Sequence, residues 1–396
     1  MAESLECASK PPLVYFIVGE PSGDQIGSHL ISALLHQSEG NIAIAGIGGP
    51  AMATVGMESL FPIDLFSVMG LDFLPGIWHI LRRMRQLEDD IVACRPDCIV
   101  MIDAQTLSQK MGERLQPLNI PLVQYVAPTV WAWRAGRAKR ISRHLRHLLT
   151  IFPFEAPWFE AHGLPTTFVG HPAAEPDPPI DKEIKSFRLA HLANTATPTL
   201  ALLPGSRRKE VRRHLSLYRT VMQRLTAQGM TPTCLVPLVR SVADYAKAFL
   251  EDWPTSLVTV PAEQYKHVVF AISDVALAAS GTVTIELAVA GTPTVVCYKL
   301  PWHEGKAARL IINTPHVSAI NILAAAEIMP EYVLDRCTPD GIVSALAPLL
   351  HDPSLRAAQA KRIRDTAAHL SVPGQKPSDI AARAILRIIS EGCEHE

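Results

Sequence analysis

The chain has 396 residues, enough for about two domains that each bury a core. Hydrophobic residues make up 48% and charged residues 19%, which excludes a disordered chain. The 37 Lys and Arg residues nearly balance 38 Asp and Glu residues, so the overall charge gives no reason to expect nucleic acid as a partner. Seven scattered cysteines lack the two close pairs of a zinc site, which fits a reducing cytoplasm.

The N-terminal residues "MAESLECASKPP" lack the apolar core of a signal peptide. No uncharged apolar run reaches the length of about 18 residues that a membrane-spanning helix needs. We therefore expect a cytoplasmic protein without such a helix. Its mean hydropathy of +0.16 is nevertheless high, which predicts apolar surface somewhere in the chain.

Strand-like runs alternate with segments of helical periodicity along the whole chain. The first set of expected strands covers residues 13–18, 42–48, 98–103, 121–126 and 147–152. A proline-rich stretch, "GHPAAEPDPPIDKE" (170–183), reads as a linker. The second set covers 199–207, 232–239, 256–260, 274–280 and 293–299, and helices are expected over 340–350, 353–370 and 377–391. This alternation predicts two doubly wound α/β domains that bind ligands at the carboxyl ends of their strands.

The stretch "VGEPSGDQIGSHL" (18–30) joins the first expected strand to a helix. Unpaired backbone N–H groups at a helix start attract anions, and glycine allows close approach, so Ser22 and Gly23 are candidates to hold phosphate. The glycine spacing matches neither a dinucleotide fingerprint nor a Walker loop. The alternative is a tight turn in which Asp24 or Ser22 caps a helix.

A second turn of this kind lies in "LLPGSRRKEV" (202–211), where a strand ends in Gly-Ser and a basic helix follows. Arg207 stands at the start of that helix, and its planar guanidinium suits a diphosphate. A capped turn with a solvated basic face is the alternative.

A third turn lies in "AASGTVTIELAVAGTP" (278–293). The hydroxyl and N–H groups of Ser280, Gly281 and Thr282 suit phosphate, and Glu286 could accept hydrogen bonds from ribose hydroxyls. The structural alternative for Glu286 is a capping box.

Two stretches suggest an anionic or lipid surface. "YVAPTVWAWRAGRAKRISRHLRH" (125–147) combines tryptophans with a dense run of cations, which favours an anionic substrate or membrane over nucleic acid. A solvated helix face is the alternative for its later arginines. "FSVMGLDFLPGIWHILRRMRQL" (66–87) carries an apolar stripe that ends in arginines, typical of an interfacial helix, although a core helix is the more common outcome. The candidate membrane-facing or acyl-facing residues are Val68, Met69, Leu71, Phe73, Leu74, Ile77, Trp78 and Leu81.

Together these stretches resemble the lipid-A-disaccharide synthase family, glycosyltransferase family 19. The matching motifs are "GEPSGD", "SVMG", "YVAPTVWAWR", "FPFE", "FVGHP", "LLPGSRRKEV", "ASGTVTIE", "AGTPTVV" and "VSAINILAAAEIMPE", in family order from residue 19 to 331. The resemblance implies a GT-B fold, with two Rossmann-like doubly wound domains facing across a cleft. It places the acceptor and the membrane at an N-terminal domain (1–172), with a C-terminal helix (375–396) packing back on it, and the UDP-sugar at a second domain (184–370).

The implied reaction joins UDP-2,3-diacylglucosamine to 2,3-diacylglucosamine 1-phosphate (lipid X), forming a β-1,6 disaccharide and releasing UDP. The implied partners are the UDP-sugar donor, the acylated acceptor and the lipid surface of the inner membrane, with peripheral association and with a homodimer left open. No cofactor and no metal are expected.

Inversion at the anomeric carbon needs a base, and the family's Asp-x-Pro-Asp-Phe-Asn motif assigns that role to Asp103, with His171 in reserve. The chain departs from the motif after Asp103, because its proline and second acid are absent. The resemblance adds Asn321 to the donor-binding candidates Ser22, Gly23, Arg207, Ser280, Gly281, Thr282 and Glu286, although Ala325 and Ala326 replace the Gly-Arg of that family stretch.

Two other functions stay open at this point. A UDP-N-acetylglucosamine 2-epimerase would share the fold and the nucleotide site, and UDP release that depends on an acceptor separates it from a synthase. A nucleotide-sugar-binding protein that has lost catalysis would bind UDP without turnover.

Overall fold

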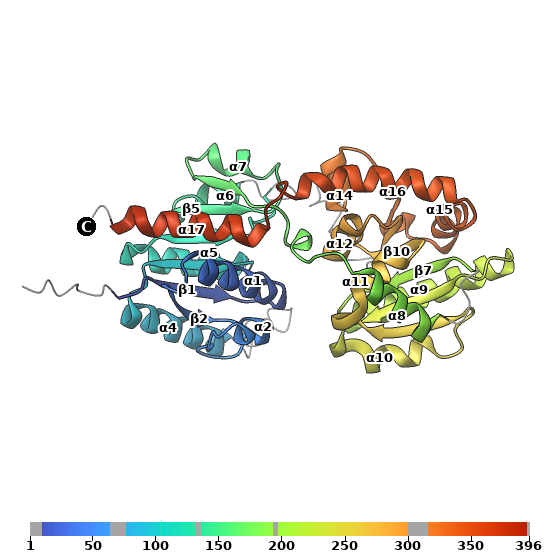
Figure 1. The fold of residues 1–396 in the computed structure, drawn as a ribbon, viewed down its shortest axis with the longest axis horizontal. Coiled ribbons are helices and arrows are strands. Elements are labelled where there is room, and N and C mark those ends of the chain that lie inside the picture. Colours follow the sequence, from blue (N-terminus) through green and yellow to red (C-terminus); the bar gives the residue numbers. More distant parts are fainter. Residues whose placement is uncertain are drawn as a thin grey trace, which may run out of the picture. The chain divides into compact units, whose positions relative to one another are not determined.

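The computed structural model describes residues 10–63, 77–103, 105–130, 136–192, 197–299 and 316–393. They form two compact units. Unit 1 holds the residues up to 175 and those from 370 onward, and unit 2 holds residues 176–369. Each unit has one sheet with helices packed on it (Figure 1).

Unit 1 contains a parallel sheet with the strand order β2-β1-β3-β4-β5-β6. Its strands are β1 (Leu13–Val18), β2 (Ala43–Ile47), β3 (Cys98–Ile102), β4 (Leu122–Tyr125), β5 (His147–Thr150) and β6 (Thr166–Phe168). Its helices are α1 (Pro21–Gln37), α2 (Pro50–Thr54), α4 (Ile77–Cys94), α5 (Gln105–Leu115), α6 (Gly136–Ile141), α7 (Ala156–Glu160) and α17 (Pro377–Cys393).

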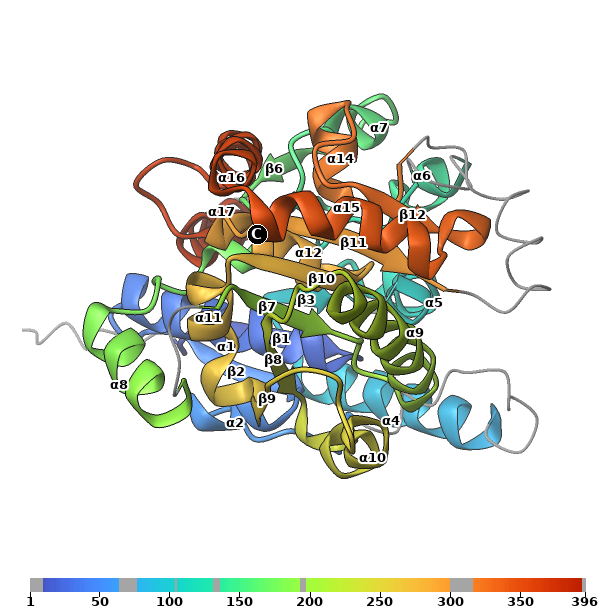
Figure 2. The ribbon, with the colours of Figure 1, turned by 90° about the vertical axis from the view of Figure 1, so that its right-hand side faces the viewer.

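Unit 2 contains a second parallel sheet with the order β12-β11-β10-β7-β8-β9, which is the strand order of the Rossmann fold. The strands are β7 (Thr199–Leu203), β8 (Thr233–Leu238), β9 (Leu257–Pro261), β10 (Val275–Ala279), β11 (Thr294–Tyr298) and β12 (Glu331–Val333). The helices are α8 (Asp181–His191), α9 (Arg208–Ala227), α10 (Arg240–Leu250), α11 (Ala262–Ile272), α12 (Thr282–Ala290), α14 (Ala319–Ala324), α15 (Pro339–His351) and α16 (Pro353–Ala367). Figure 2 faces this unit and shows its strands in that order.

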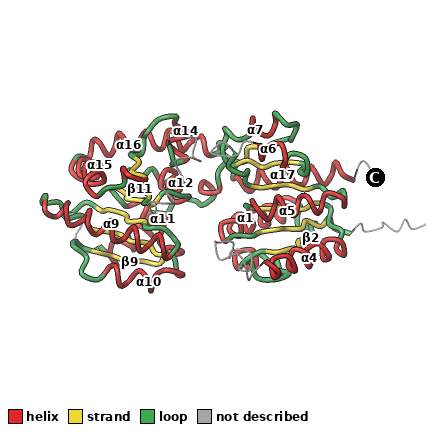
Figure 3. The backbone as a smooth tube through the Cα atoms, turned by 180° about the vertical axis from the view of Figure 1, so that it is seen from behind, coloured by secondary structure: helices red, strands yellow, loops and turns green. Residues whose placement is uncertain are grey.

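The strand residues of unit 2 are buried on both faces. Leu200 and Leu202 of β7 pack with α9, α10 and α15, whereas Ala201 and Leu203 pack with α8, α11 and α12. Successive side chains of a strand point to opposite faces, so a sheet covered by helices on both sides has continuous apolar strands. Strands lie between helices in both units (Figure 3), and the predicted class, two doubly wound α/β domains, is confirmed.

All ten expected strands are present, with ends that differ by a few residues, and the described residues contain two further strands that were not predicted. β6 reads "TTF" and β12 reads "EYV", each only three residues long. Runs this short show no periodicity, and the sheet that they extend is what makes them strands.

The two segments that connect the units are tied together within unit 1. The His171 N–H donates to the Leu370 carbonyl oxygen at 2.7 Å, and the Glu175 carboxylate accepts hydrogen bonds from the Ser378 N–H and hydroxyl. The chain therefore leaves unit 1 after residue 175, slightly beyond the expected boundary at 172. α17 follows the second crossing and packs against α1.

Candidate functional site

Each sheet reverses its winding direction next to its first strand. In unit 1, β1 lies between β2 and β3, and in unit 2, β7 lies between β8 and β10. The loops that follow the two central strands diverge at such a switch point, and ligands bind there, outside the carboxyl ends of the strands. The candidate residues Ser22, Gly23 and Asp103 lie at the switch point of unit 1, and Arg207, Ser280, Gly281 and Thr282 lie at that of unit 2.

In unit 1 the structure brings Ser22 and Asp103 together. The Ser22 hydroxyl donates a hydrogen bond to Asp103 Oδ2 at 2.5 Å. Ser22 is exposed and Asp103 is half-buried, so solvent reaches the pair. Gly23 is buried beneath it, where an added Cβ would lie 3.0 Å from Val18 Cγ1 and 3.2 Å from the Ile102 carbonyl oxygen. The glycine lets α1 begin directly against the ends of β1 and β3.

The backbone around Asp103 is unusual. Asp103 has a φ of +60°, and Val126, which follows the neighbouring strand β4, has a φ of +73°. The left-handed region is uncommon for aspartate and strained for a β-branched residue, and such strain concentrates at functional sites. The Tyr125 carbonyl oxygen accepts from the Asp103 N–H at 3.1 Å and from Gln124 Nε2 at 3.1 Å. The buried Gln124 amide therefore supports the backbone that holds Asp103.

The second acid of the "GEPSGD" turn has a structural role. The buried Asp24 carboxylate accepts hydrogen bonds from the N–H groups of Gly49, Ala51 and Met52 at 2.8 to 3.0 Å. It caps α2, not α1, which begins at Pro21 without a side-chain cap. The alternative in which Asp24 caps a helix is therefore confirmed, although that helix is α2 and not the helix that follows the turn.

In unit 2, Arg207 is the N-cap residue of α9, and its side chain is 79% exposed. Its guanidinium lies 3.5 Å from Glu210 Oε1. Gly205, two residues earlier, has a φ of +104°, and an added Cβ would lie 2.7 Å from Glu210 Oε2. The positive φ requires glycine at this turn, and the exposed Arg207 side chain at its tip can reach a ligand.

His214 was not predicted and connects two strand ends at this edge. The residue is on α9 and is completely buried. Its Nδ1 lies 2.8 Å from the Pro204 carbonyl oxygen, just after the end of β7. Lys299 follows the end of β11, and its N–H donates to His214 Nε2 at 3.3 Å. Burial lowers the pKa of His214, so the ring is neutral and both nitrogens are used. Its position on an apolar helix face gave no sign of this role in the sequence.

The turn between β10 and α12 is open to ligands. The Ser280 N–H donates to the Cys297 carbonyl oxygen at 3.0 Å, and Gly281 and Thr282 are exposed. An added Cβ on Gly281 would meet open space. Because Leu203 pairs with Ala278, this turn and the Arg207 turn follow adjacent strands and leave the sheet side by side.

Glu286 lies in the second turn of α12, where its Oε1 accepts a hydrogen bond from Lys266 Nζ at 2.9 Å. A capping box would require this glutamate at the third helical position, which Thr284 occupies. The capping-box alternative for Glu286 is therefore wrong, and its carboxylate remains available at the carboxyl edge of the sheet.

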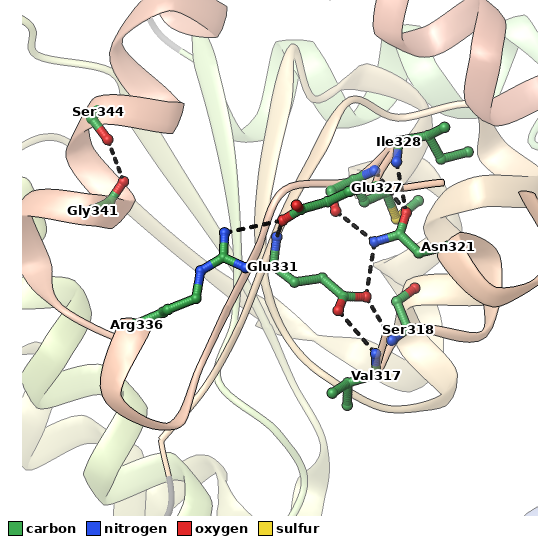
Figure 4. Close-up of polar contacts among 10 residues, drawn as sticks. Val317, Ser318, Asn321, Glu327, Ile328, Glu331, Arg336, Gly341 and Ser344 are labelled. Carbon is green, nitrogen blue, oxygen red and sulfur yellow. Dashed lines mark hydrogen bonds and ion pairs between the residues drawn. The ribbon is translucent and has the colours of Figure 1, made fainter. Parts of the chain in front are cut away.

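Asn321 is completely buried and fully hydrogen-bonded (Figure 4). Its Nδ2 donates to the Met329 carbonyl oxygen and to Glu331 Oε1, and its Oδ1 accepts from the N–H groups of Ile328 and Met329, all within 2.9 Å. Glu331 also accepts from the N–H groups of Val317 and Ser318 at the start of α14. Asn321 thus shapes the loop between α14 and β12, and these contacts favour an indirect part in donor binding.

His171 is buried and braces the segment that leaves unit 1. Its Nδ1 accepts from the Ala173 N–H at 3.0 Å, and its ring lies 5.2 Å from that of Phe152. Burial lowers the pKa of His171 to about 4, so the ring is neutral. Because Nδ1 is an acceptor, the proton is on Nε2, which favours a bracing role over that of a base.

Most of the expected membrane-facing residues lie outside the described residues, namely Val68, Met69, Leu71, Phe73 and Leu74. Ile77 and Trp78 begin α4, but their side chains are not described. Leu81 is 39% exposed, whereas Met84, Leu87 and Ile91 of the same helix are buried in the core of unit 1. The tryptophans at 131 and 133 also lie outside the described residues, and Lys139 and Arg140 of α6 are exposed.

Among the described residues, no group of three or more His, Cys, Asp or Glu side chains is arranged to hold a metal ion. None of the helices in the described ranges combines the length and apolarity needed to cross a membrane.

The model of the lipid-A-disaccharide synthetase family matches residues 14–385. The lipid-A-disaccharide synthase of Rhodospirillum centenum is 38% identical over 385 residues, with 96% of each chain covered. Two solved structures share the fold at low identity. MurG of Acinetobacter baumannii has a TM-score of 0.58 at 14% identity, covering 96% of this chain and 100% of its own. The UDP-GlcNAc 2-epimerase of Neisseria meningitidis has a TM-score of 0.63 at 12% identity, with the same coverage.

The structural matches confirm the predicted GT-B fold, and the sequence matches separate the synthase from the epimerase. Since the family model and the relative span nearly the whole chain, this protein belongs to the lipid-A-disaccharide synthetase family, an enzyme family of glycosyltransferases in lipid A biosynthesis.

Proposed function

We propose that this enzyme transfers the diacylglucosamine unit of UDP-2,3-diacylglucosamine to the 6-hydroxyl of 2,3-diacylglucosamine 1-phosphate. The observation that carries the proposal is the Ser22–Asp103 pair at the switch point of unit 1, where a carboxylate is held at a solvent-accessible edge. A general base of this kind is what an inverting transfer needs.

In the proposed step, Asp103 takes the proton of the acceptor hydroxyl while the hydroxyl oxygen attacks the anomeric carbon from the side opposite to UDP. The bond between that carbon and the phosphate oxygen breaks, and UDP leaves with the electron pair. The products are the β-1,6 disaccharide, UDP and a protonated Asp103, which returns its proton to water.

UDP develops negative charge as it leaves, and the unit 2 turns supply groups that stabilise it. Arg207 is exposed at one turn, and the Ser280 hydroxyl and the N–H and hydroxyl groups of Thr282 are at the other. Glu286 would accept hydrogen bonds from ribose hydroxyls. The N. meningitidis epimerase, which has this fold, binds UDP-GlcNAc, and that supports a nucleotide-sugar donor.

The residues after Asp103 that depart from the family motif lie in α5. This helix starts at Gln105, and Leu107 is buried in the core of unit 1. The residues that depart from the motif, including the one in place of its second acid, therefore belong to the first turn of a helix. Ser22 still supplies a hydrogen bond to Asp103, the proposed base. This arrangement favours catalysis over a protein that only binds nucleotide-sugars.

Both proposed substrates carry acyl chains, so the enzyme would act at the surface of the inner membrane. The exposed Leu81 and the exposed Arg82 and Arg85 of α4 fit that contact. The proposal also includes the acceptor site, the membrane contact and a homodimer. Sedimentation of the purified protein tests for the homodimer.

The decisive experiment incubates purified enzyme with both acylated sugars and detects the disaccharide by mass. We expect the disaccharide and one UDP per product, with UDP release that requires the acceptor. Nucleotide-sugar isomerisation without the acceptor would indicate an epimerase. UDP binding without any product would indicate a protein that has lost catalysis.

A further inference from the structure

The helices on either side of β10 meet at the carboxyl edge of the unit 2 sheet. α11 begins at this edge and leads into β10, and α12 begins at the same edge after β10. Lys266, in the second turn of α11, and Glu286, in the second turn of α12, therefore lie at the same level. The distance from Lys266 Nζ to Glu286 Oε1 is 2.9 Å.

This ion pair is more enclosed than the intrahelical lysine pairs in the described part of the chain. The side chains of Lys266 and Glu286 are 34% and 21% exposed, whereas those of Lys361 and Asp365 on α16 are 74% and 61% exposed. Partial burial reduces solvent screening and fixes both rotamers, so the Lys266–Glu286 pair holds its geometry better than an exposed pair.

We propose that Lys266 is a positioning residue of the donor site, whose ammonium group orients the Glu286 carboxylate toward the ribose hydroxyls of a nucleoside diphosphate. This inference rests on the proposed function, which places the donor at the β10–α12 turn. Neither the sequence motifs nor the comparisons assign a role to Lys266.

The chemistry of the carboxylate permits both contacts at once. An ionised carboxylate has about four acceptor positions on its two oxygens, and Lys266 occupies one of them. The two ribose hydroxyls can each donate a hydrogen bond, and a hydrogen bond to an ionised carboxylate is stronger than one to a neutral acceptor. The contact with Lys266 holds the Glu286 carboxylate in one orientation, so the ligand does not need to order it.

The test measures UDP binding to the full-length enzyme by calorimetry, with variants of both members of the pair. We expect Glu286→Gln and Lys266→Met each to weaken UDP binding by about tenfold, as for the loss of one charge-assisted hydrogen bond. Lys266→Arg should stay within about threefold of the parent because it keeps the charge. Lys361→Met, which removes an exposed pair from α16, is the matched control and should leave binding unchanged.

A ligand without ribose hydroxyls separates positioning from direct contact. The parent and Lys266→Met should bind 2′,3′-dideoxyuridine diphosphate equally, because Glu286 then has no hydroxyl to accept. The double variant Glu286→Gln/Lys266→Met should bind UDP no more weakly than Glu286→Gln alone, because coupled residues are not additive. In turnover, Lys266→Met should raise the donor KM and leave kcat nearly unchanged.

The binding measurements distinguish a positioning role of Lys266 from the alternatives. If Lys266→Met binds UDP as the parent does while Glu286→Gln binds it weakly, the inference is wrong and the donor site of the proposed function stands. If Lys266→Met weakens UDP and the dideoxy analogue equally, Lys266 contacts the phosphates and the positioning role is wrong. If the parent itself neither binds UDP nor makes the disaccharide, the proposed function fails first.

Discussion

Ser22 Oγ donates a hydrogen bond of 2.5 Å to Asp103 Oδ2, although the two residues are 81 positions apart in the sequence. The pairing follows from the sheet, because β1 and β3 are neighbouring parallel strands and the two residues come just after them. A hydroxyl in the first turn of α1 thus orients a carboxylate at the end of β3. This relationship explains why a serine in the "GEPSGD" turn and an aspartate after the third strand belong to one site.

Replacing Asp103 with Asn keeps the size of the side chain and removes the proposed base. We expect turnover to fall by roughly 100-fold or more, as is typical when a general base is lost. UDP binding and the thermal midpoint should stay close to those of the parent, because the half-buried amide can still accept from Ser22. Steady-state kinetics and calorimetry check this, and turnover within a few-fold of the parent would move the role to another residue.

Asp24→Asn is the matched control for Asp103→Asn, since both acids belong to the same region of unit 1. Asp24 accepts three backbone hydrogen bonds and is buried, so its replacement should lower the free energy of unfolding by roughly 1–3 kcal/mol. The folded fraction should retain the turnover of the parent.

Arg207→Ala removes an exposed guanidinium from the turn between β7 and α9. We expect the donor KM to rise by about 10-fold to 100-fold, which corresponds to about 1.5–3 kcal/mol for a hydrogen bond to a charged group. The unfolding midpoint should hardly change, because the side chain is 79% exposed and its ion pair with Glu210 is long. Kinetics with limiting and saturating donor test this, and an unchanged donor KM would contradict the assignment.

The sequence predicted the elements of the site better than the contacts of its individual residues. Strand-to-helix turns with glycine and serine are local features, so the turns at Ser22, Arg207 and Ser280 could be found from spacing alone. The hydrogen bonds of Asp24 and His214 go to residues that are distant in the sequence or follow another strand, and no local pattern encodes them. Asn321 was expected to contact the donor because it lies in a family motif, but a motif does not reveal that its amide is fully hydrogen-bonded.

Asn321→Ala tests the structural role of that amide. The substitution leaves the N–H groups of Ile328 and Met329 without their buried acceptor and removes one of the donors to Glu331, so the free energy of unfolding should fall by roughly 2–4 kcal/mol. Ser344→Ala, which removes an exposed hydroxyl on α15, should change it by less than about 0.5 kcal/mol. Urea titrations give both values. Unchanged stability with greatly weakened UDP binding would instead show direct contact with the donor.

His171→Asn tests a pH dependence. Burial lowers the pKa of His171 from 6.5 to about 4, so the unfolded chain takes up a proton as the pH falls below 6.5 and the folded chain does not. The neutral His171 therefore contributes fully to the free energy of unfolding above pH 6.5. This contribution, about 3 kcal/mol, is lost as the pH falls from 6.5 to about 4. Asparagine cannot titrate but can still accept from the Ala173 N–H, so the variant should show a flatter stability curve between those pH values.

The same variant separates bracing from catalysis at His171. At neutral pH we expect turnover within a few-fold of the parent, because the ring has its acceptor nitrogen occupied by the Ala173 N–H. A loss of turnover of roughly 100-fold in a folded protein would identify His171 as the base instead of Asp103.

Leu81→Gln tests the membrane contact with a residue whose exposure is known. Leu81 is 39% exposed on α4, and Val92, at the other end of the same helix, is 50% exposed. If the N-terminal end of α4 inserts into lipid, Leu81→Gln should weaken binding to anionic liposomes by roughly tenfold, from about 1–2 kcal/mol of lost apolar burial. Val92→Gln should leave liposome binding unchanged, and neither variant should shift the thermal midpoint by more than about 2 °C, because both side chains already face solvent. Flotation assays over a range of lipid concentrations measure the binding. Equal effects of the two substitutions, or a parent that does not bind liposomes, would show that this end of α4 does not contact the membrane.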